Sequence, residues 1–220
     1  MTGTNDERGG DDVDPREMLA LLEAEQARTQ EALDPDPRLI FAVWGIAWLL
    51  GFTVFWMAAS ATSPIEVPMA GAALFFFGCM AVAVAVTTTH IGRRVVGVRG
   101  GSSTVGAMYG WSWFLAFATL TAIMQGAFRN GLSDDTTGLL WSVLSGLVVG
   151  VLYLAGGALW QDWSQFGLGA WILISSAVGA LAGYPAVYLV MAVGGGGGFL
   201  LAALYFVVRR RGTPETTARV

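Results

Sequence analysis

The chain has 220 residues, of which 55% are hydrophobic and 13% are charged, and its formal net charge is −4. Soluble globular domains carry about 25% charged residues, so this composition excludes an ordinary water-soluble protein. All 12 basic residues are arginine, and there is one cysteine and one histidine, which excludes lysine Schiff-base chemistry, an intrachain disulfide and a multi-histidine metal site.

The charged residues are concentrated before the first apolar run. Residues 1–38 contain 11 of the 16 acidic residues and 4 of the 12 basic ones. We expect residues 1–13 to be disordered, because they are polar and rich in glycine and aspartate. Residues 14–33 predict a helix, since a proline suits its first turn and the spacing from Asp14 to Glu17 is that of a capping box.

This N-terminal helix is predicted to be amphipathic and cytoplasmic. Its leucines follow a heptad-like spacing that is weakened by polar residues at two of the five positions, and its acidity argues against adhesion to anionic lipid. Two interpretations remain open, namely a solvated helix next to the membrane and a helix for docking or self-association. The prolines in residues 34–38 end it.

Six apolar stretches follow, each close to the roughly 20 residues that a helix needs to cross the hydrocarbon core. They predict an all-α protein, a polytopic membrane bundle of six transmembrane helices. A turn at Tyr184-Pro185 separates the last two stretches. The expected spans are 39–59, 68–89, 104–127, 137–159, 166–183 and 185–208, followed by a C-terminal tail at 209–220.

The positions of the arginines favour an even number of spans. With the N-terminus in the cytoplasm, 11 of the 12 arginines lie inside and Arg129 alone lies outside. Cytoplasmic loops carry an excess of basic residues, whereas five spans would place Arg209–Arg211 outside. We therefore predict a multi-pass plasma-membrane protein with both termini in the cytoplasm.

Small residues recur at four-residue intervals in the third, fourth and fifth spans. In lipid, such spacing lets helix backbones approach closely and gain van der Waals contact. The pattern predicts that these three spans form a tight bundle. The residues concerned are Gly106 and Gly110, then Ser142, Gly146 and Gly150, then Ser175, Gly179 and Gly183.

The sixth span contains five consecutive glycines, Gly194, Gly195, Gly196, Gly197 and Gly198. No lysine follows them, which excludes a phosphate-binding loop. Unpaired backbone facing lipid costs several kcal/mol per group, so we expect the run to stay mainly helical. Two interpretations remain open, a surface for close helix packing and a hinge or locally unwound segment that lines a cavity.

A few polar and aromatic side chains are candidates for lining a solute pathway. His90, near the inner end of the second span, could relay a proton or simply be solvated. Gln125 could bond a neighbouring helix or a solute, and Asp162 could line a cytoplasmic vestibule. Trp44 and Trp48 share one face of the first span and could surround an organic cation or apolar ligand, although packing explains them equally well.

Several function classes find no support in the sequence. There is no HExxH or GxSxG motif, and no basic surface with interleaved aromatic residues for nucleic acid. No charged residue lies deep in any span, which weakens ion-coupled transport. We expect no enzyme activity and no cofactor. The expected partners are the lipid bilayer, a further copy of the chain in a homo-oligomer and a small neutral or amphipathic solute.

The segment LLWSVLSGLVVGVLYLAGGALWQDWSQFGLGAWIL at 139–173 and the downstream YPAVYLVMAVGGGGGFLLAA carry a family resemblance. They resemble a group of uncharacterised actinobacterial six-span membrane proteins, some of them loosely described as transporters. The resemblance implies a six-helix fold in a bacterial plasma membrane and no site residues. Two hypotheses follow. One is a small-solute transporter whose glycine-rich sixth helix moves, and the other is a non-transporting scaffold, sensor or accessory subunit that acts through the N-terminal helix.

Overall fold

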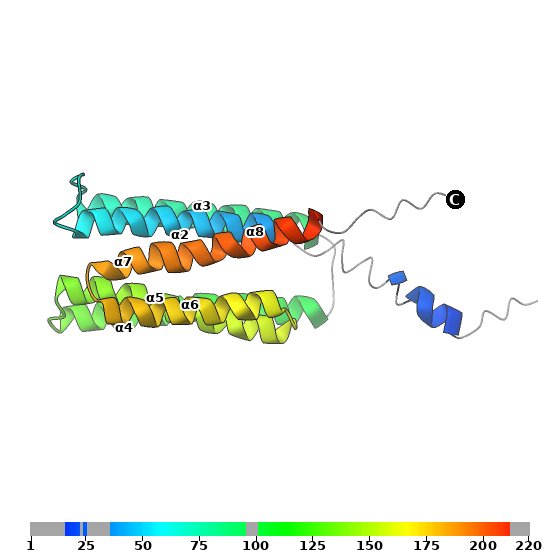
Figure 1. The fold of residues 1–220 in the computed structure, drawn as a ribbon. Coiled ribbons are helices and arrows are strands. Elements are labelled where there is room, and N and C mark those ends of the chain that lie inside the picture. The colour runs from blue at the N-terminus through cyan, green and yellow to red at the C-terminus, as the bar shows by residue number, and fades with distance from the viewer. Residues whose placement is uncertain (1–15, 23, 26–35, 96–100, 212–220) are drawn as a thin grey trace, which may run out of the picture.

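The computed structural model describes residues 16–22, 24–25, 36–95 and 101–211 (Figure 1). Within these ranges every regular element is a helix, and six helices are long and apolar enough to cross a membrane. The chain is therefore an all-α, multi-pass membrane protein. The spans are α2 (Pro37–Ala59), α3 (Met69–Val95), α4 (Gly101–Arg129), α5 (Asp134–Leu159), α6 (Trp163–Ala182) and a sixth helix built from α7 (Ala186–Val190), η1 (Met191–Gly196) and α8 (Gly197–Arg211).

Only part of the predicted N-terminal helix lies within the described residues. Residues 16–22 and 24–25 are helical, inside the predicted range of 14–33. The rest of that helix, the segment 1–13 predicted to be disordered and the tail beyond residue 211 lie outside the described residues.

Side-chain caps explain why three helices begin earlier than predicted. Asp36, Ser133 and Asp162 each accept hydrogen bonds from backbone N–H groups in the first turn of α2, α5 and α6. Such a cap satisfies donors that no helical carbonyl can reach. Asp134 and Asp135 lie in the first turn of α5, where a negative charge is favourable.

The sixth helix lies between two groups of helices (Figure 1). One group is α2 with α3, and the other is α4, α5 and α6. The sixth helix packs against α2 on one side and against α6 on the other, and α5 and α6 pack closely together. We call the end of the bundle where α2 begins and α8 ends the terminal end, and the opposite end the far end.

The chain turns between α6 and α7 at the far end, where the sequence predicted a break. Gly183 closes α6 with a φ of 75°, a conformation that glycine adopts without steric cost. Pro185 precedes the first turn of α7 as its N-cap rather than lying in that turn. Gly183 therefore ends a helix, and an added Cβ atom there would contact nothing within 4 Å.

Aromatic rings fill the centre of the bundle. Trp48 of α2 packs edge-on against Phe52 and against Phe199 of α8, with ring centroids 5.5 Å apart in both pairs. Tyr153 of α5 meets Phe199 from the other side at 5.6 Å. Edge-to-face packing at these distances is favourable. In the part of the chain that the structure describes, the centre is thus occupied by side chains.

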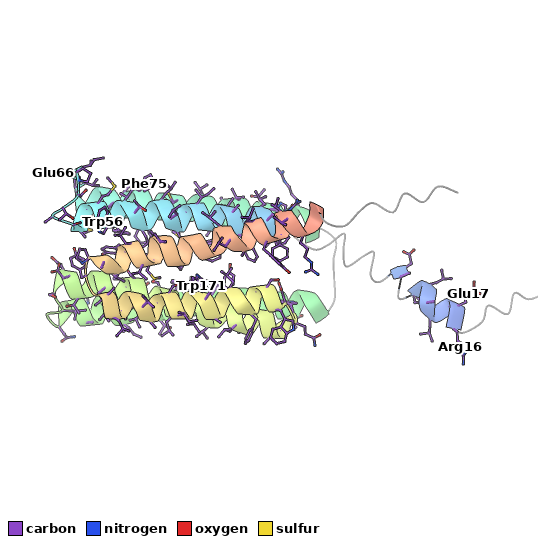
Figure 2. All side chains as sticks on the ribbon, viewed as in Figure 1. Arg16, Glu17, Trp56, Glu66, Phe75 and Trp171 are labelled. Atoms are coloured by element: carbon purple, nitrogen blue, oxygen red, sulfur yellow. The ribbon has the colours of Figure 1, made fainter. Side chains whose placement is uncertain are left out.

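The outer faces of α3 and α4 carry large exposed apolar side chains, such as Leu74 and Trp111, and Phe75 projects away from the bundle (Figure 2). This is expected of surfaces solvated by lipid. The glycines of α4 share this environment, because an added Cβ at Gly106 or Gly110 would contact nothing within 4 Å. Their spacing was predicted to pack α4 against its neighbours, and in this structure it does not.

Candidate functional site

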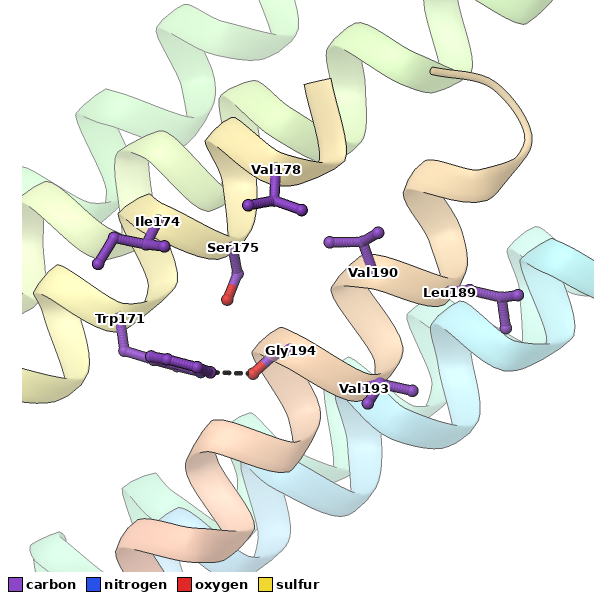
Figure 3. Close-up of a pocket in the computed structure, with 8 residues that line it drawn as sticks. All are labelled: Trp171, Ile174, Ser175, Val178, Leu189, Val190, Val193 and Gly194. Atoms are coloured by element: carbon purple, nitrogen blue, oxygen red, sulfur yellow. Dashed lines mark hydrogen bonds between the residues drawn. The ribbon is translucent and has the colours of Figure 1, made fainter. Parts of the chain in front are cut away.

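Two cavities lie in line along the groove between α6 and the sixth helix. The far cavity has a volume of about 380 Å³ and extends from Trp171 toward the far end (Figure 3). The terminal cavity has a volume of about 500 Å³ and extends from Trp171 toward the terminal end. Both are open along one side, since lining side chains such as Val193 in the far cavity and Leu201 in the terminal cavity are 67% and 65% exposed.

Trp171 separates the two cavities and lines both of them. Its indole Nε1 donates a hydrogen bond of 2.8 Å to the backbone carbonyl oxygen of Gly194 (Figure 3). The bond crosses the groove from α6 to the sixth helix. It ties the two walls together at the middle of their length.

The acceptor carbonyl belongs to an unusual part of the sixth helix. Residues Met191–Gly196 form a π-helical turn, and the N–H of Gly197 points back to the carbonyl of Ala192, five residues earlier. The glycine run is therefore helical, but its first half is wound more widely than an α-helix. Single π turns are rare and occur frequently at functional sites.

Two glycines of the run bring the sixth helix close to α2. A Cβ atom at Gly195 would lie 2.6 Å from the ring of Trp48, and one at Gly196 would lie 2.7 Å from the backbone nitrogen of Leu49. Both distances are too short for real atoms, so only glycine permits this approach. This side of the π turn is a packing surface.

Two other glycines of the run face α6. A Cβ atom at Gly194 would lie 2.9 Å from the Oγ atom of Ser175, and one at Gly198 would overlap the indole ring of Trp171. Gly197 differs from its neighbours, because a Cβ atom there would meet nothing within 4 Å. The glycine run thus packs against both α2 and α6, and Gly197 is the one position of the run that contacts neither helix.

Ser175 places a hydroxyl at the far cavity. Its side chain is 4% exposed and points toward Gly194 (Figure 3). Serine in a helix often bonds back to a carbonyl one turn earlier, as Ser176 does to Ile172 at 2.8 Å. Within the described part of the chain the hydroxyl of Ser175 makes no such bond, and the buried side-chain oxygen without a partner there is Oγ1 of Thr137. The hydroxyl can both donate and accept a hydrogen bond, so it can pair with a ligand in the far cavity.

The predicted packing glycines of α5 and α6 lie behind the groove rather than in it. A Cβ atom at Gly146 would overlap the Oγ atom of Ser176, and one at Gly150 would lie 2.7 Å from the side chain of Leu173. Gly179 faces Val187 of α7, at 3.2 Å from an added Cβ. These close approaches fix the position of α6, and hence of the cavity wall.

The predicted polar and aromatic candidates at the terminal end tie α2 to α3. The Nε2 atom of His90 accepts a hydrogen bond of 3.1 Å from the backbone N–H of Asp36. The indole of Trp44 donates to the Oγ1 atom of Thr87 at 3.1 Å. Neither side chain lines a cavity.

The remaining three candidates also lie outside both cavities. Trp48 is buried in the aromatic core. Asp162 caps α6, and its carboxylate accepts from the N–H groups of Ser164 and Gln165 at 2.8 and 3.2 Å. Gln125 is exposed on α4. Of the residues singled out from the sequence, Ser175, Gly194 and Gly198 line a cavity.

Sequence reasoning gave Trp171 no role and assigned Ser175 to a packing pattern. The available signal was their spacing of four residues, which places both on one face of a helix. That spacing does not indicate which helix they face. The pairing of α6 with the glycine run of the sixth helix became visible only in the structure.

Comparisons with known proteins give no match, because no protein-family model, curated protein or solved structure matches the chain. Within the described ranges there is also no group of three or more His, Cys, Asp or Glu side chains that could hold a metal ion.

Proposed function

We propose that this multi-pass membrane protein transports a small neutral or amphipathic solute, which it binds in the far cavity. The observation that carries the proposal is the hydroxyl of Ser175, which lines an apolar space of about 380 Å³ and makes no hydrogen bond to another described residue. Small-molecule sites are typically apolar, with a few polar groups that orient the ligand.

The lining of the far cavity defines the class of solute. Apart from Ser175 it consists of glycine and apolar side chains, so a charged solute would find no counter-ion and would lose its hydration. A solute with an apolar body and one hydrogen-bonding group fits better. That group would pair with the hydroxyl of Ser175.

The π turn and the bond from Trp171 to Gly194 provide the moving part. A hydrogen bond of this kind contributes about 0.5–1.5 kcal/mol net, so thermal motion can break it. Release of Trp171 would join the two cavities into one path along the groove. Because Gly195 and Gly196 hold the other side of the turn against α2, α2 acts as the fixed support. Interrupted helices at substrate sites are common in transporters.

We propose an orientation with both termini in the cytoplasm of a bacterial cell, supported by the arginine distribution. Cysteines introduced at Leu132 and Gly97, in a Cys79→Ala background, test it. Leu132 lies in the loop between α4 and α5 at the far end. A membrane-impermeant thiol reagent should label Leu132→Cys from outside and Gly97→Cys from inside. The reverse pattern would contradict the orientation.

The Ser175→Ala variant tests the transport proposal. A thermal-shift screen of the purified protein identifies a solute, and proteoliposome flux then measures its transport. The variant should bind that solute about 5–10-fold more weakly, the equivalent of one hydrogen bond, while its unfolding temperature stays unchanged because no protein partner is lost.

Ser142→Ala is the matched control. Its hydroxyl bonds the carbonyl of Gly138 at 2.9 Å in α5, away from both cavities. This variant should lose some stability and keep full solute affinity. Equal solute affinity in wild type and Ser175→Ala, or no flux of any solute in wild type, would remove the proposal.

A second candidate function is a scaffold, sensor or accessory subunit that acts through the N-terminal helix. The supporting observation is that Leu19 and Leu22 are 58% and 61% exposed on the helical residues 16–22, where they could dock on a partner. Deletion of residues 1–33 distinguishes the two functions. Loss of partner capture in a pull-down, together with no flux in wild type, would favour the scaffold.

A further inference from the structure

We propose that the far end of the bundle carries a site for a small organic ammonium ion, formed by the carboxylate of Asp135, the hydroxyl of Tyr188 and the ring of Tyr184. The site lies outside both cavities. It goes beyond the proposed transport function and does not rest on it, because a bound cation requires no flux.

Three helix ends bring these groups together, because α2 ends and α5 and α7 begin at the far end (Figure 1). Asp135 lies in the first turn of α5, and Tyr184 and Tyr188 lie before and within α7. A Cβ atom at Gly138 would overlap the hydroxyl of Tyr188 and lie 3.4 Å from the ring of Tyr184. Gly138 follows Asp135 by three residues and shares its face of α5. Both tyrosines therefore lie against the face that carries the carboxylate.

The hydroxyl of Tyr188 makes no hydrogen bond to another described residue, although the residue is 4% exposed. In contrast, the hydroxyl of Tyr109 donates to the backbone carbonyl of Leu152 at 2.7 Å. The ring of Tyr188 is held by stacking on Phe55 and by an edge contact with Tyr184, at centroid distances of 5.3 and 5.8 Å. Its hydroxyl, which can donate and accept, is thus fixed at the surface of α5. This observation is independent of the carboxylates.

The carboxylates of Asp134 and Asp135 also lack a protein partner. Asp36 and Asp162 direct their carboxylates into the first turns of their own helices. Asp134 and Asp135 make no hydrogen bond or ion pair to another described residue. Both are exposed, so a cation can reach them from water.

The positive charges at the far end do not cancel these carboxylates. Arg129 is the one basic residue among the described residues of this end, and it forms no ion pair with Asp134 or Asp135. The N-terminus of α5 adds a partial charge of about one half, against two full negative charges. Glu66, in the loop between α2 and α3, adds a third carboxylate at this end (Figure 2). The far end is therefore negative and attracts cations.

The ring of Tyr184 lies close to the carboxylates. Partial burial raises the pKa of its phenol, and the carboxylates of Asp135 and Asp134 raise it further. A cation held by Asp135 is thus near an aromatic ring, and attraction between a cation and a ring adds to the binding.

This set of groups favours an organic ammonium over a metal ion. A carboxylate and a phenol oxygen accept hydrogen bonds from N–H groups, and charged partners make such bonds stronger. Calcium and magnesium need about six oxygen ligands. Within the described ranges no three His, Cys, Asp or Glu side chains come together, and the flanking groups here are aromatic.

The experiment is calorimetric titration of the full-length protein in detergent with n-propylammonium chloride. We expect n-propylammonium to bind, and 1-propanol, which has no charge, to bind at least tenfold more weakly. Tetramethylammonium has no N–H donor and should also bind more weakly. Asp135→Asn should weaken n-propylammonium at least tenfold, the effect of one hydrogen bond to a charged group. Glu66→Gln removes the same charge at the same end and is the matched control, with a change below about twofold.

Tyr188→Phe removes the hydroxyl and keeps the ring. It should weaken n-propylammonium about three- to tenfold and leave the unfolding temperature unchanged, because the hydroxyl has no protein partner. Tyr109→Phe is its matched control. That variant loses the bond to Leu152, so it should be less stable and keep full affinity.

Four outcomes would overturn the proposal. The first is equal affinity in wild type and Asp135→Asn, and the second is equal weakening by Asp135→Asn and Glu66→Gln, which would indicate surface charge alone. The third is full affinity in Tyr188→Phe, which would leave its hydroxyl to water. The fourth is displacement of n-propylammonium by an equal concentration of sodium, which would indicate any cation. None of these results bears on the Ser175→Ala test, so the two proposals can fail separately.

Discussion

Gly196 of the sixth helix lies so close to Leu49 of α2 that a Cβ atom at position 196 would sit 2.7 Å from the Leu49 backbone nitrogen. Because backbone atoms cannot swing aside, Gly196→Ala must push the two helices apart. We expect it to lower the free energy of unfolding by about 1–3 kcal/mol, the usual cost of overpacking. Unfolding in detergent measures the effect.

Gly197→Ala is the matched control for this prediction. It adds the same methyl group one residue later, where nothing lies within 4 Å. Alanine favours a helix over glycine by roughly 0.8–1 kcal/mol in water, so this variant should be at least as stable as wild type. If the two variants lose the same stability, the close approach of α2 and the sixth helix is wrong.

Replacing Trp171 by phenylalanine removes the hydrogen bond to Gly194 and keeps an aromatic ring in the groove. The lost bond is worth about 0.5–1.5 kcal/mol. We expect hydrogen exchange of the amides in residues 191–197 to speed up about two- to tenfold, because the π turn opens more readily. Exchange measured by mass spectrometry checks this.

Trp163→Phe is the control for that experiment. Trp163 is 83% exposed and lies in the first turn of α6, eight positions before Trp171. Exchange in residues 191–197 should be the same in this variant as in wild type. An equal change in both variants would show that loss of any tryptophan on α6, rather than of the bond to Gly194, loosens the turn.

The number and order of the membrane helices could be predicted from the sequence. The hydrocarbon core requires about 20 apolar residues per span, and that requirement acts on each segment separately. The starts of α2, α5 and α6 were predicted two or three residues too late, because the polar caps Asp36, Ser133 and Asp162 lie next to the apolar run rather than within it.

The candidate site could not be predicted in the same way, because it depends on which helix faces which. The spacing of Gly106 and Gly110 equals that of Gly146 and Gly150, yet the first pair faces away from the bundle and the second packs on α6. A pattern of small residues permits close approach and does not choose the partner. The winding of the glycine run has the same limit, since glycine accepts both α and π geometry.

The hydrogen bond from the Asp36 backbone to His90 predicts a local role for the single histidine. It joins the first turn of α2 to α3 across 54 positions in the sequence. His90→Phe removes the acceptor, and we expect it to lower the free energy of unfolding by about 0.5–1.5 kcal/mol and to speed exchange of the Asp36 amide. His90→Gln offers an oxygen acceptor and should restore part of the loss. If exchange at Asp36 is unchanged in His90→Phe, the bond does not form in solution.

Because of Tyr184, in the turn between α6 and α7, we expect the stability of the fold to depend on pH. Partial burial raises the pKa of its phenol, and the nearby carboxylates of Asp135 and Asp134 raise it further. Because the folded pKa lies above the unfolded value of about 10, this group stabilises the fold fully below pH 10 and loses that effect as the pH rises through the folded pKa.

The test is a pH titration followed by ultraviolet absorbance, carried out on wild type and on Tyr184→Phe. Subtracting the second curve from the first gives the titration of the Tyr184 phenol alone. We expect its midpoint above the ordinary tyrosine value. In Asp135→Asn the midpoint should fall toward that value, since one of the two repelling charges is gone. Glu66→Gln neutralises a carboxylate in the loop between α2 and α3, which is not among the causes of the shift, and should leave the midpoint in place. A midpoint that moves equally in both variants would indicate a response to net charge alone, and the local arrangement of Tyr184 with the start of α5 would then be wrong.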